Sequence, residues 1–136
     1  MKKAMVKAGK GLRKVFPMIL GTVLLISLIS VLIPKSFYLT IFGKNLFLDL
    51  IIGSLIGSIS EGNPIISYIL GGELLNQGVS LLAITAFLVA WVTVGVIQLP
   101  VESATLGKKF ALSRNITAFV LAIMVAVITI LILGVF

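Results

Sequence analysis

The residues best suited to chemistry lie together at Ser58-Ile-Ser-Glu-Gly-Asn-Pro64, inside an otherwise apolar stretch. Asn63 is a favoured cap before a helix, and Pro64 suits the first helical position because its missing N–H would be unpaired there anyway. The pattern therefore predicts a break between two helices. Carbonyl groups ending the first helix and N–H groups starting the second would face one spot, as they do where discontinuous helices bind substrates and ions.

Glu61 stands in the middle of this break. Ionisable residues inside a membrane are costly and usually functional, so we expect Glu61 to exchange a proton or to bind a cation. The alternative is a turn at the cytoplasmic surface, with Glu61 solvated. Gln98 is expected at the same membrane level and could face Glu61, or it could make an interhelical hydrogen bond worth about 0.6 kcal/mol. The candidate binding residues are Ser58, Ser60, Glu61, Gly62, Asn63, Pro64 and Gln98.

Composition excludes much other chemistry. The chain has no cysteine and no histidine, which removes disulfides, thiolate ligands, cysteine nucleophiles and the commonest metal ligand and proton shuttle. We therefore expect no catalytic residue, no metal site and no cofactor. An intramembrane enzyme is the least favoured class, because the sequence shows no paired-carboxylate site either.

The same composition places the break in a membrane. Of the 136 residues, 60% are hydrophobic and 11% are charged, whereas a soluble domain usually carries about 25% charged residues. The formal net charge is +7, but basic residues concentrated before the first apolar run are typical of a topology signal and not of nucleic-acid binding. These residues are Lys2, Lys3, Lys7, Lys10, Arg13 and Lys14.

Three apolar runs are long enough to be full spans. Val15–Ile33 corresponds to about 28 Å of helix, which matches a hydrocarbon core of about 30 Å. The other two are Val79–Leu99, ended by Pro100, and Ile116–Phe136. The prediction is a basic cytoplasmic segment, residues 1–14, followed by a single transmembrane domain, residues 15–136, in the cell membrane.

The stretch Leu46–Gln77 holds the break, and its halves, about 22 Å and about 18 Å long as helices, are each too short to span. The amino terminus and the basic loop Pro100–Asn115 should both be cytoplasmic, so this stretch must leave from and return to the external side. The predicted fold is an all-α integral membrane protein with three full transmembrane helices and one broken helical hairpin. The carboxyl terminus would be external.

The remaining polar and small residues are expected to have structural roles. Asp49 and Glu73, near the outer ends of the two half-helices, should reach external water, with a functional role as the alternative. Glu102 should be a solvated loop charge. Lys35–Lys44 fits an external interfacial stretch. The spacing Gly53-x-x-x-Gly57 lets helices approach closely. The same holds for Ser54, Ser58, Ala118, Ala122 and Ala126.

The hairpin also carries a family resemblance. Gly57–Pro64, then Ile65-Ile-Ser-Tyr-Ile-Leu-Gly-Gly72, Gly78 and Ala86-Phe-Leu-Val-Ala90 resemble the predicted-permease family that includes organoarsenical efflux permeases, over about Leu46–Asn115. The resemblance implies a broken hairpin in a transport domain. Those permeases have cysteines where this chain has Ser58 and Ser60, so thiolate capture of arsenic is not implied. The family usually carries two such units in one chain and this chain carries one, which is typical of a half-permease.

The sequence therefore favours a half-permease that moves a small molecule or ion by alternating access. It would act in the lipid membrane as a homodimer or with a related half-permease, since one hairpin and three helices offer few walls for a closed pathway. One alternative is a membrane interaction or assembly subunit without transport. Another is a cation-selective pore with a ring of Glu61.

Overall fold

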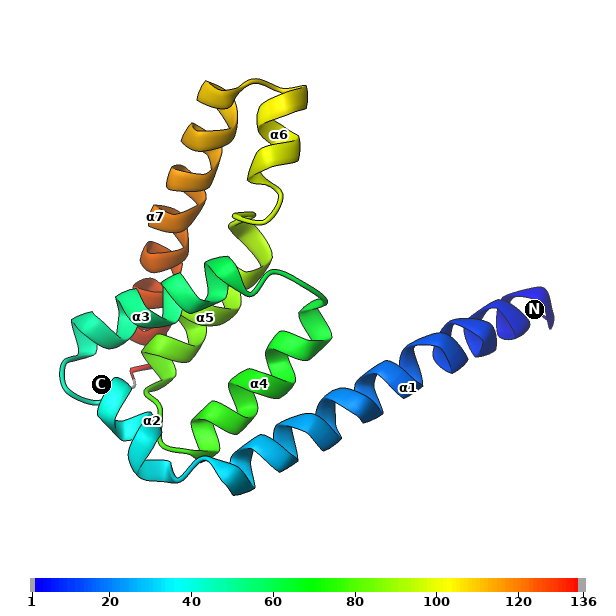
Figure 1. Ribbon diagram of the computed structural model, residues 1–136, viewed down its shortest axis with the longest axis horizontal. Helices are drawn as coiled ribbons and strands as arrows, with labels where there is room; N and C mark the ends of the chain where they lie inside the picture. The colour runs from blue at the N-terminus through cyan, green and yellow to red at the C-terminus, as the bar shows by residue number, and fades with distance from the viewer. Residues whose placement is uncertain (1, 135–136) are drawn as a thin grey trace. The chain divides into compact units, whose positions relative to one another are not determined.

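A computed structural model describes the backbone of residues 2–134 and their side chains except those of Lys2, Ile29 and Ser30. This part of the chain forms helices and no strands, as the predicted all-α fold requires. The helices, drawn in Figure 1, are α1 (Lys2–Leu32), α2 (Lys35–Ile41), α3 (Leu46–Ile59), α4 (Pro64–Asn76), α5 (Leu81–Thr93), α6 (Leu99–Thr105) and α7 (Lys108–Leu133). They belong to two units, one holding α1 and the other holding α2 to α7.

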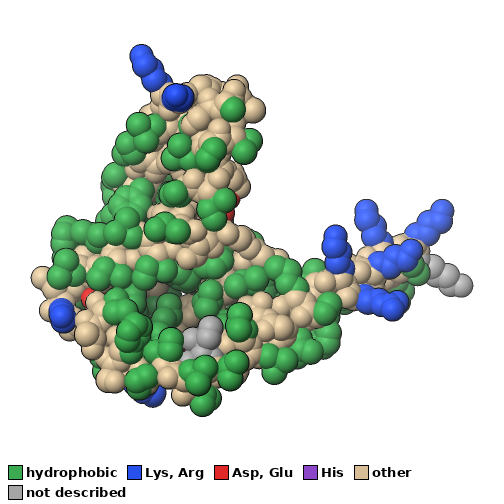
Figure 2. Space-filling view, viewed as in Figure 1, with side chains coloured by type: hydrophobic (Ala, Val, Ile, Leu, Met, Phe, Trp, Pro, Cys, Tyr) green, Lys and Arg blue, Asp and Glu red, His purple; other side chains and the backbone are tan. Residues whose placement is uncertain are grey.

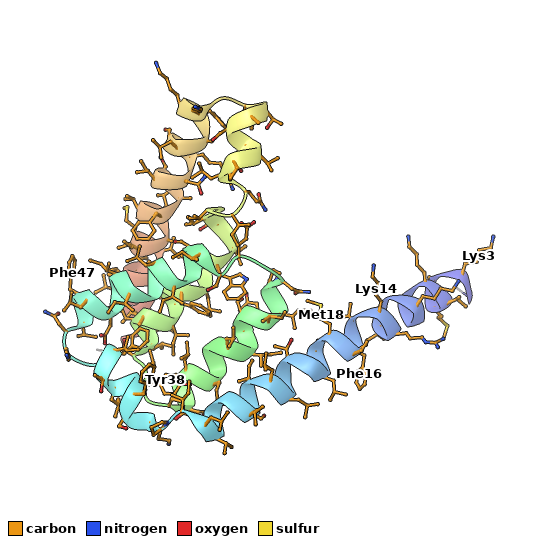
Figure 3. All side chains as sticks on the ribbon, in the orientation of Figure 1. Lys3, Lys14, Phe16, Met18, Tyr38 and Phe47 are labelled. Atoms are coloured by element: carbon orange, nitrogen blue, oxygen red, sulfur yellow. The ribbon has the colours of Figure 1, made fainter. Side chains whose placement is uncertain are left out.

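The first unit is a single 31-residue helix with Pro17 inside it. The predicted span Val15–Ile33 therefore continues backwards, without interruption, through the basic segment. Basic side chains gather along the N-terminal part of α1 (Figure 2), where Lys3 and Lys14 are labelled in Figure 3. Within α1, Lys3–Leu28 is long and apolar enough to cross a membrane.

The second unit contains the predicted hairpin. Its two arms are the short helices α3 and α4, separated at the predicted break. Asn45 caps α3 by accepting a hydrogen bond from the Phe47 N–H at 3.0 Å. Asn63 caps α4 in the same way, accepting from the Ile65 N–H at 2.9 Å, and Pro64 is the first residue of α4. The prediction of two half-helices, with this cap and this starting proline, is confirmed.

The prediction of one continuous span over Val79–Leu99 is wrong, because α5 ends at Thr93. The backbone becomes extended at Val94, and the freed Gly95 N–H donates to Asn115 Oδ1 at 2.9 Å. A side chain of α7 thus replaces the helical partner that this N–H has lost. Pro100 does not terminate a span either, since it lies in the first turn of α6.

The last helix begins earlier than predicted. α7 starts at Lys108, not at Ile116, and ends at Leu133, while Phe136 lies outside the described residues. Over the described residues, α1 and α7 are the helices long and apolar enough to cross a membrane. The pair α2 and α3, bent by 104°, counts as a third only if it is one bent span. The α5 helix, at 13 residues, is a shorter apolar helix.

The core of the second unit is built around α5. Ala83, Ala86 and Ala90 on α5 are completely buried, as is Ala126 on α7. On the α3 side, a Cβ added at Gly53 would lie 2.3 Å from the Ala83 carbonyl oxygen. The α3 backbone therefore packs directly against the α5 backbone, as the small-residue spacing predicts.

Gly57→Ala and Gly72→Ala form a matched pair that tests this contact. An added Cβ at Gly57 would lie 2.3 Å from the Phe87 carbonyl oxygen, whereas at Gly72 it would meet nothing within 4 Å. We expect Gly57→Ala to cost about 1–3 kcal/mol, as overpacking does, and Gly72→Ala to be neutral or to stabilise α4 by up to about 1 kcal/mol. Thermal unfolding in one detergent, followed by circular dichroism, checks both. Equal behaviour of the two variants would mean that α3 and α5 are not in backbone contact.

Candidate functional site

Two helix breaks lie side by side in the second unit. The first, residues 60–63, separates α3 from α4, and the second, residues 94–98, separates α5 from α6. Successive turns of α3 contact successive turns of α5, since Gly53 lies against Ala83 and Gly57 lies against Phe87. The α3 and α5 helices are therefore parallel neighbours, and their carboxyl ends reach the two breaks at the same level.

A hydrogen bond joins the breaks. Gln98 Nε2 donates to Glu61 Oε1, so the structure brings together two residues that are far apart in the sequence but were both expected at this level. The other carboxylate oxygen, Glu61 Oε2, is buried and has no hydrogen-bond partner. Beside it, a Cβ at Gly62 would lie 3.5 Å from the indole of Trp91, whose own N–H is also buried and unpaired.

A second polar group adjoins the first and was missed by the sequence reasoning. Arg114 on α7 forms an ion pair with Glu102 on α6, so Glu102 is not the solvated loop charge that we expected. Asn115 donates to Glu102 Oε2 at 3.3 Å and accepts from Gly95. The sequence signal that could have revealed this group is the polar pair Arg114-Asn115 at the start of an apolar run. The spacing along the chain did not indicate which residues this pair contacts.

Gly95 connects the two polar groups. A Cβ at this position would lie 3.4 Å from Arg114 Nη1 and 3.5 Å from the Gln98 Cβ. The Arg114 guanidinium and the Gln98 side chain therefore both lie close to the non-helical backbone at Gly95. Glu61, Gln98, Glu102, Arg114 and Asn115 form one polar cluster, which we call the break cluster.

The other predicted binding residues have different positions. Ser58 is buried, and its hydroxyl donates to the Ser54 carbonyl oxygen at 2.6 Å within α3. Ser60 ends α3 and lines a cavity. Asn63 and Pro64 shape the start of α4. At the tip, Glu61 is thus the predicted binding residue whose side chain belongs to the break cluster.

The remaining two carboxylates are engaged. Asp49 does not reach water, because it is 2% exposed and both its oxygens accept from the Gly43 N–H, each at 2.9 Å. Glu73 is half-buried and accepts from Gln77 Nε2 at 2.7 Å. Among the described residues, Glu61 is the carboxylate that keeps a buried oxygen without a partner.

A cavity of about 260 Å³ lies between α2, the two hairpin arms and α5. Its lining is apolar apart from a few polar atoms, and five of its side chains are aromatic. These are Phe37, Tyr38, Phe42, Phe87 and Trp91. Ser60 and Trp91 belong to the lining and also adjoin the first break, so the cavity reaches the neighbourhood of Glu61.

Replacing Glu102 with glutamine should lower the melting temperature near neutral pH but not in acid. Arg114 donates a hydrogen bond to the Glu102 carboxylate and forms an ion pair with it, so this contact requires an ionised carboxyl. The ion pair therefore stabilises the fold near neutral pH, and this contribution is lost in acid, where the carboxyl is protonated. Thermal unfolding at about pH 7 and about pH 3 measures the difference. A deficit that persists in acid would mean that the shape of residue 102 matters and its charge does not.

The chain was compared with protein-family models, with curated proteins and with solved structures, and none of them matches. The assignment of a function therefore depends on the break cluster and the cavity described above.

Proposed function

We propose that this chain is a membrane permease subunit that moves a small solute by alternating access, with Glu61 as the residue that exchanges a proton or holds a cation. The observation that carries the proposal is the meeting of two helix breaks through the hydrogen bond between Glu61 and Gln98. Discontinuous helices that face each other are the usual construction of transporter binding sites.

The energetics of a membrane support this reading. Open backbone is tolerated at membrane depth only where it is buried in protein or lines a wet cavity, because unpaired N–H and C=O groups are costly in lipid. Residues 60–63 and 94–98 place two open segments side by side. The positive end of α4 and the negative ends of α3 and α5 converge there, so the site offers partial charges of both signs.

The proposed membrane arrangement changes one part of the sequence prediction. The spans are α1, α7 and the pair α5 and α6, which together take the place of the predicted continuous span. The hairpin α3–α4 enters from and returns to the external side. The amino terminus is cytoplasmic and the carboxyl terminus external, as the distribution of lysine and arginine favours.

The proposed assembly is a parallel dimer. Gln98 is exposed although it belongs to the break cluster, and its neighbours Val96 and Ile97 are 40% and 61% exposed. One subunit thus leaves the second break open on one side. A second copy, or a related half-permease, would cover this side and complete the walls of the pathway.

Glu61→Gln is the direct test of the coupling role. Glutamine keeps the size and the hydrogen bond to Gln98 but cannot titrate. In wild type, infrared difference spectra recorded across a pH step should show a protonated-carboxyl band that Glu61→Gln lacks. If a solute is known, the same variant should abolish its pH-driven flux into liposomes.

The control for this experiment is Glu73→Gln, which makes the same chemical change outside the break cluster and should leave the band in place. Both variants should retain helical content and a particle mass of twice the 14.5 kDa of one chain. If the wild-type spectrum contains no titrating carboxyl that disappears in Glu61→Gln, proton coupling is refuted. A protein that stays monomeric in lipid would refute the dimer.

The topology is tested with single cysteines, since the natural chain has none. A cysteine at Gly134 should react with a membrane-impermeant maleimide added outside intact cells, whereas one at Gly107, before the basic start of α7, should react only after permeabilisation. The expectation follows from the retention of basic loops in the cytoplasm. Labelling of residue 134 only from the cytoplasmic side would require the hairpin to cross the membrane once.

A further inference from the structure

We propose that the cavity between the hairpin arms binds a small lipophilic cation, with its apolar body among the aromatic side chains and its positive charge toward Glu61. This inference rests on the proposed function and deepens it, because it names the class of substrate. Three observations carry it: the aromatic lining, the charge around the cavity and the cavity volume.

The lining favours a cation with an apolar body. Aromatic side chains come from two parts of the lining, with Tyr38 and Phe42 on the α2 side and Phe87 and Trp91 on α5. The faces of aromatic rings attract cations, most strongly those of tryptophan, and they do so especially where water is excluded. Aromatic cages are a common way to recognise quaternary ammonium groups.

The charge near the cavity has the matching sign. Ser60 lines the cavity, Glu61 follows it in the chain, and Gly62 lies against the ring of Trp91. Glu61 is not part of the lining: it lies in the chain between two residues that adjoin the cavity, its Oε1 accepts from Gln98, and its Oε2 is buried without a partner. Among the residues that the structure describes, the lining contains no lysine or arginine, and the nearby Arg114 is paired with Glu102. An anion would find no positively charged side chain in this part of the cavity wall.

The volume limits the ligand to about one ring and one head group. The cavity measures about 260 Å³, below the range of about 300–1,000 Å³ typical of sites for drug-sized ligands. Benzyltrimethylammonium has this size and a fixed positive charge. Neopentylbenzene is its neutral isostere, with carbon in place of nitrogen, so the two compounds differ in charge and not in shape.

The single tryptophan of the chain makes the binding test site-specific. Trp91 lines the cavity, so its fluorescence reports what enters. The full chain in lipid nanodiscs is titrated with each compound. We expect benzyltrimethylammonium to change the emission saturably and to bind about tenfold or more tightly than neopentylbenzene, since a desolvated cation gains from both the rings and the carboxylate. Equal affinity for the two compounds would overturn the proposal. The cavity would then be a site for apolar groups, such as acyl chains, without a preference for charge.

Two pairs of variants test which residues cause the preference for the cation over its neutral isostere. Glu61→Gln should remove most of the tenfold difference, whereas Glu73→Gln should keep it. Tyr38→Leu should weaken cation binding about threefold or more by removing a ring from the lining. Tyr68→Leu should have no effect, because Tyr68 is 65% exposed and lies outside the lining. Loss of cation preference in both members of a pair would refute the assignment to the cavity.

The experiment separates this inference from the proposed function. Binding of the cation without a titrating Glu61 would support the ligand class and refute proton coupling. A titrating Glu61 in a protein that shows no cation preference would support the coupling role and refute the ligand class. The comparison of two compounds on the unaltered chain needs no variant, so it holds even if a variant fails to fold.

Discussion

The contact between the backbones of α3 and α5 is the constraint on which the second unit depends. A Cβ at Gly53 or Gly57 would lie 2.3 Å from a carbonyl oxygen of α5, so these positions leave no room for a side chain. Gly53 meets Ala83 and Gly57 meets Phe87, four residues later on both helices, so α3 and α5 run parallel and reach their carboxyl ends together. The two breaks can share polar groups only because this contact fixes their common level.

Side chains supply the hydrogen-bond partners that the non-helical backbone at the two breaks lacks. Asn63 accepts from the Ile65 N–H at the start of α4, and Asn115 accepts from the Gly95 N–H beyond the end of α5. A buried donor or acceptor without a partner costs about 1–3 kcal/mol, which explains why such amides lie at both breaks. Glu61 Oε2 is an exception among these atoms, and this unpaired oxygen is the reason why Glu61 is proposed as the residue that exchanges a proton or holds a cation.

The cavity and the break cluster differ in character but adjoin each other. The cavity is lined by aromatic side chains, whereas the break cluster consists of charged and amide side chains. Ser60 and Trp91 line the cavity and also lie beside the first break. A charge beside an apolar space acts more strongly than one in water, because the local dielectric is low. This combination suits a ligand that is apolar over most of its surface and charged at one end.

The sequence by itself determined the features that depend on neighbouring residues. The hairpin, its cap at Asn63, its starting proline and the close-packing face at Gly53 and Gly57 all follow from short-range rules of capping, proline geometry and side-chain size. Glu61 as the carboxylate of the break followed from its place between two apolar stretches.

Only the tertiary structure decided the rest. The apolar run containing α5 is long enough for one continuous helix, but α5 ends at Thr93, and the Gly95 N–H freed there finds its partner in Asn115, 20 residues further along the chain. Asp49 is buried for the same kind of reason, since the Gly43 N–H, which lies outside the helix of Asp49, donates to both of its carboxylate oxygens. The pairing of Arg114 with Glu102 likewise needed α6 and α7 to lie side by side. A sequence pattern records what each residue prefers, whereas a hydrogen bond across the fold depends on which distant group arrives within reach.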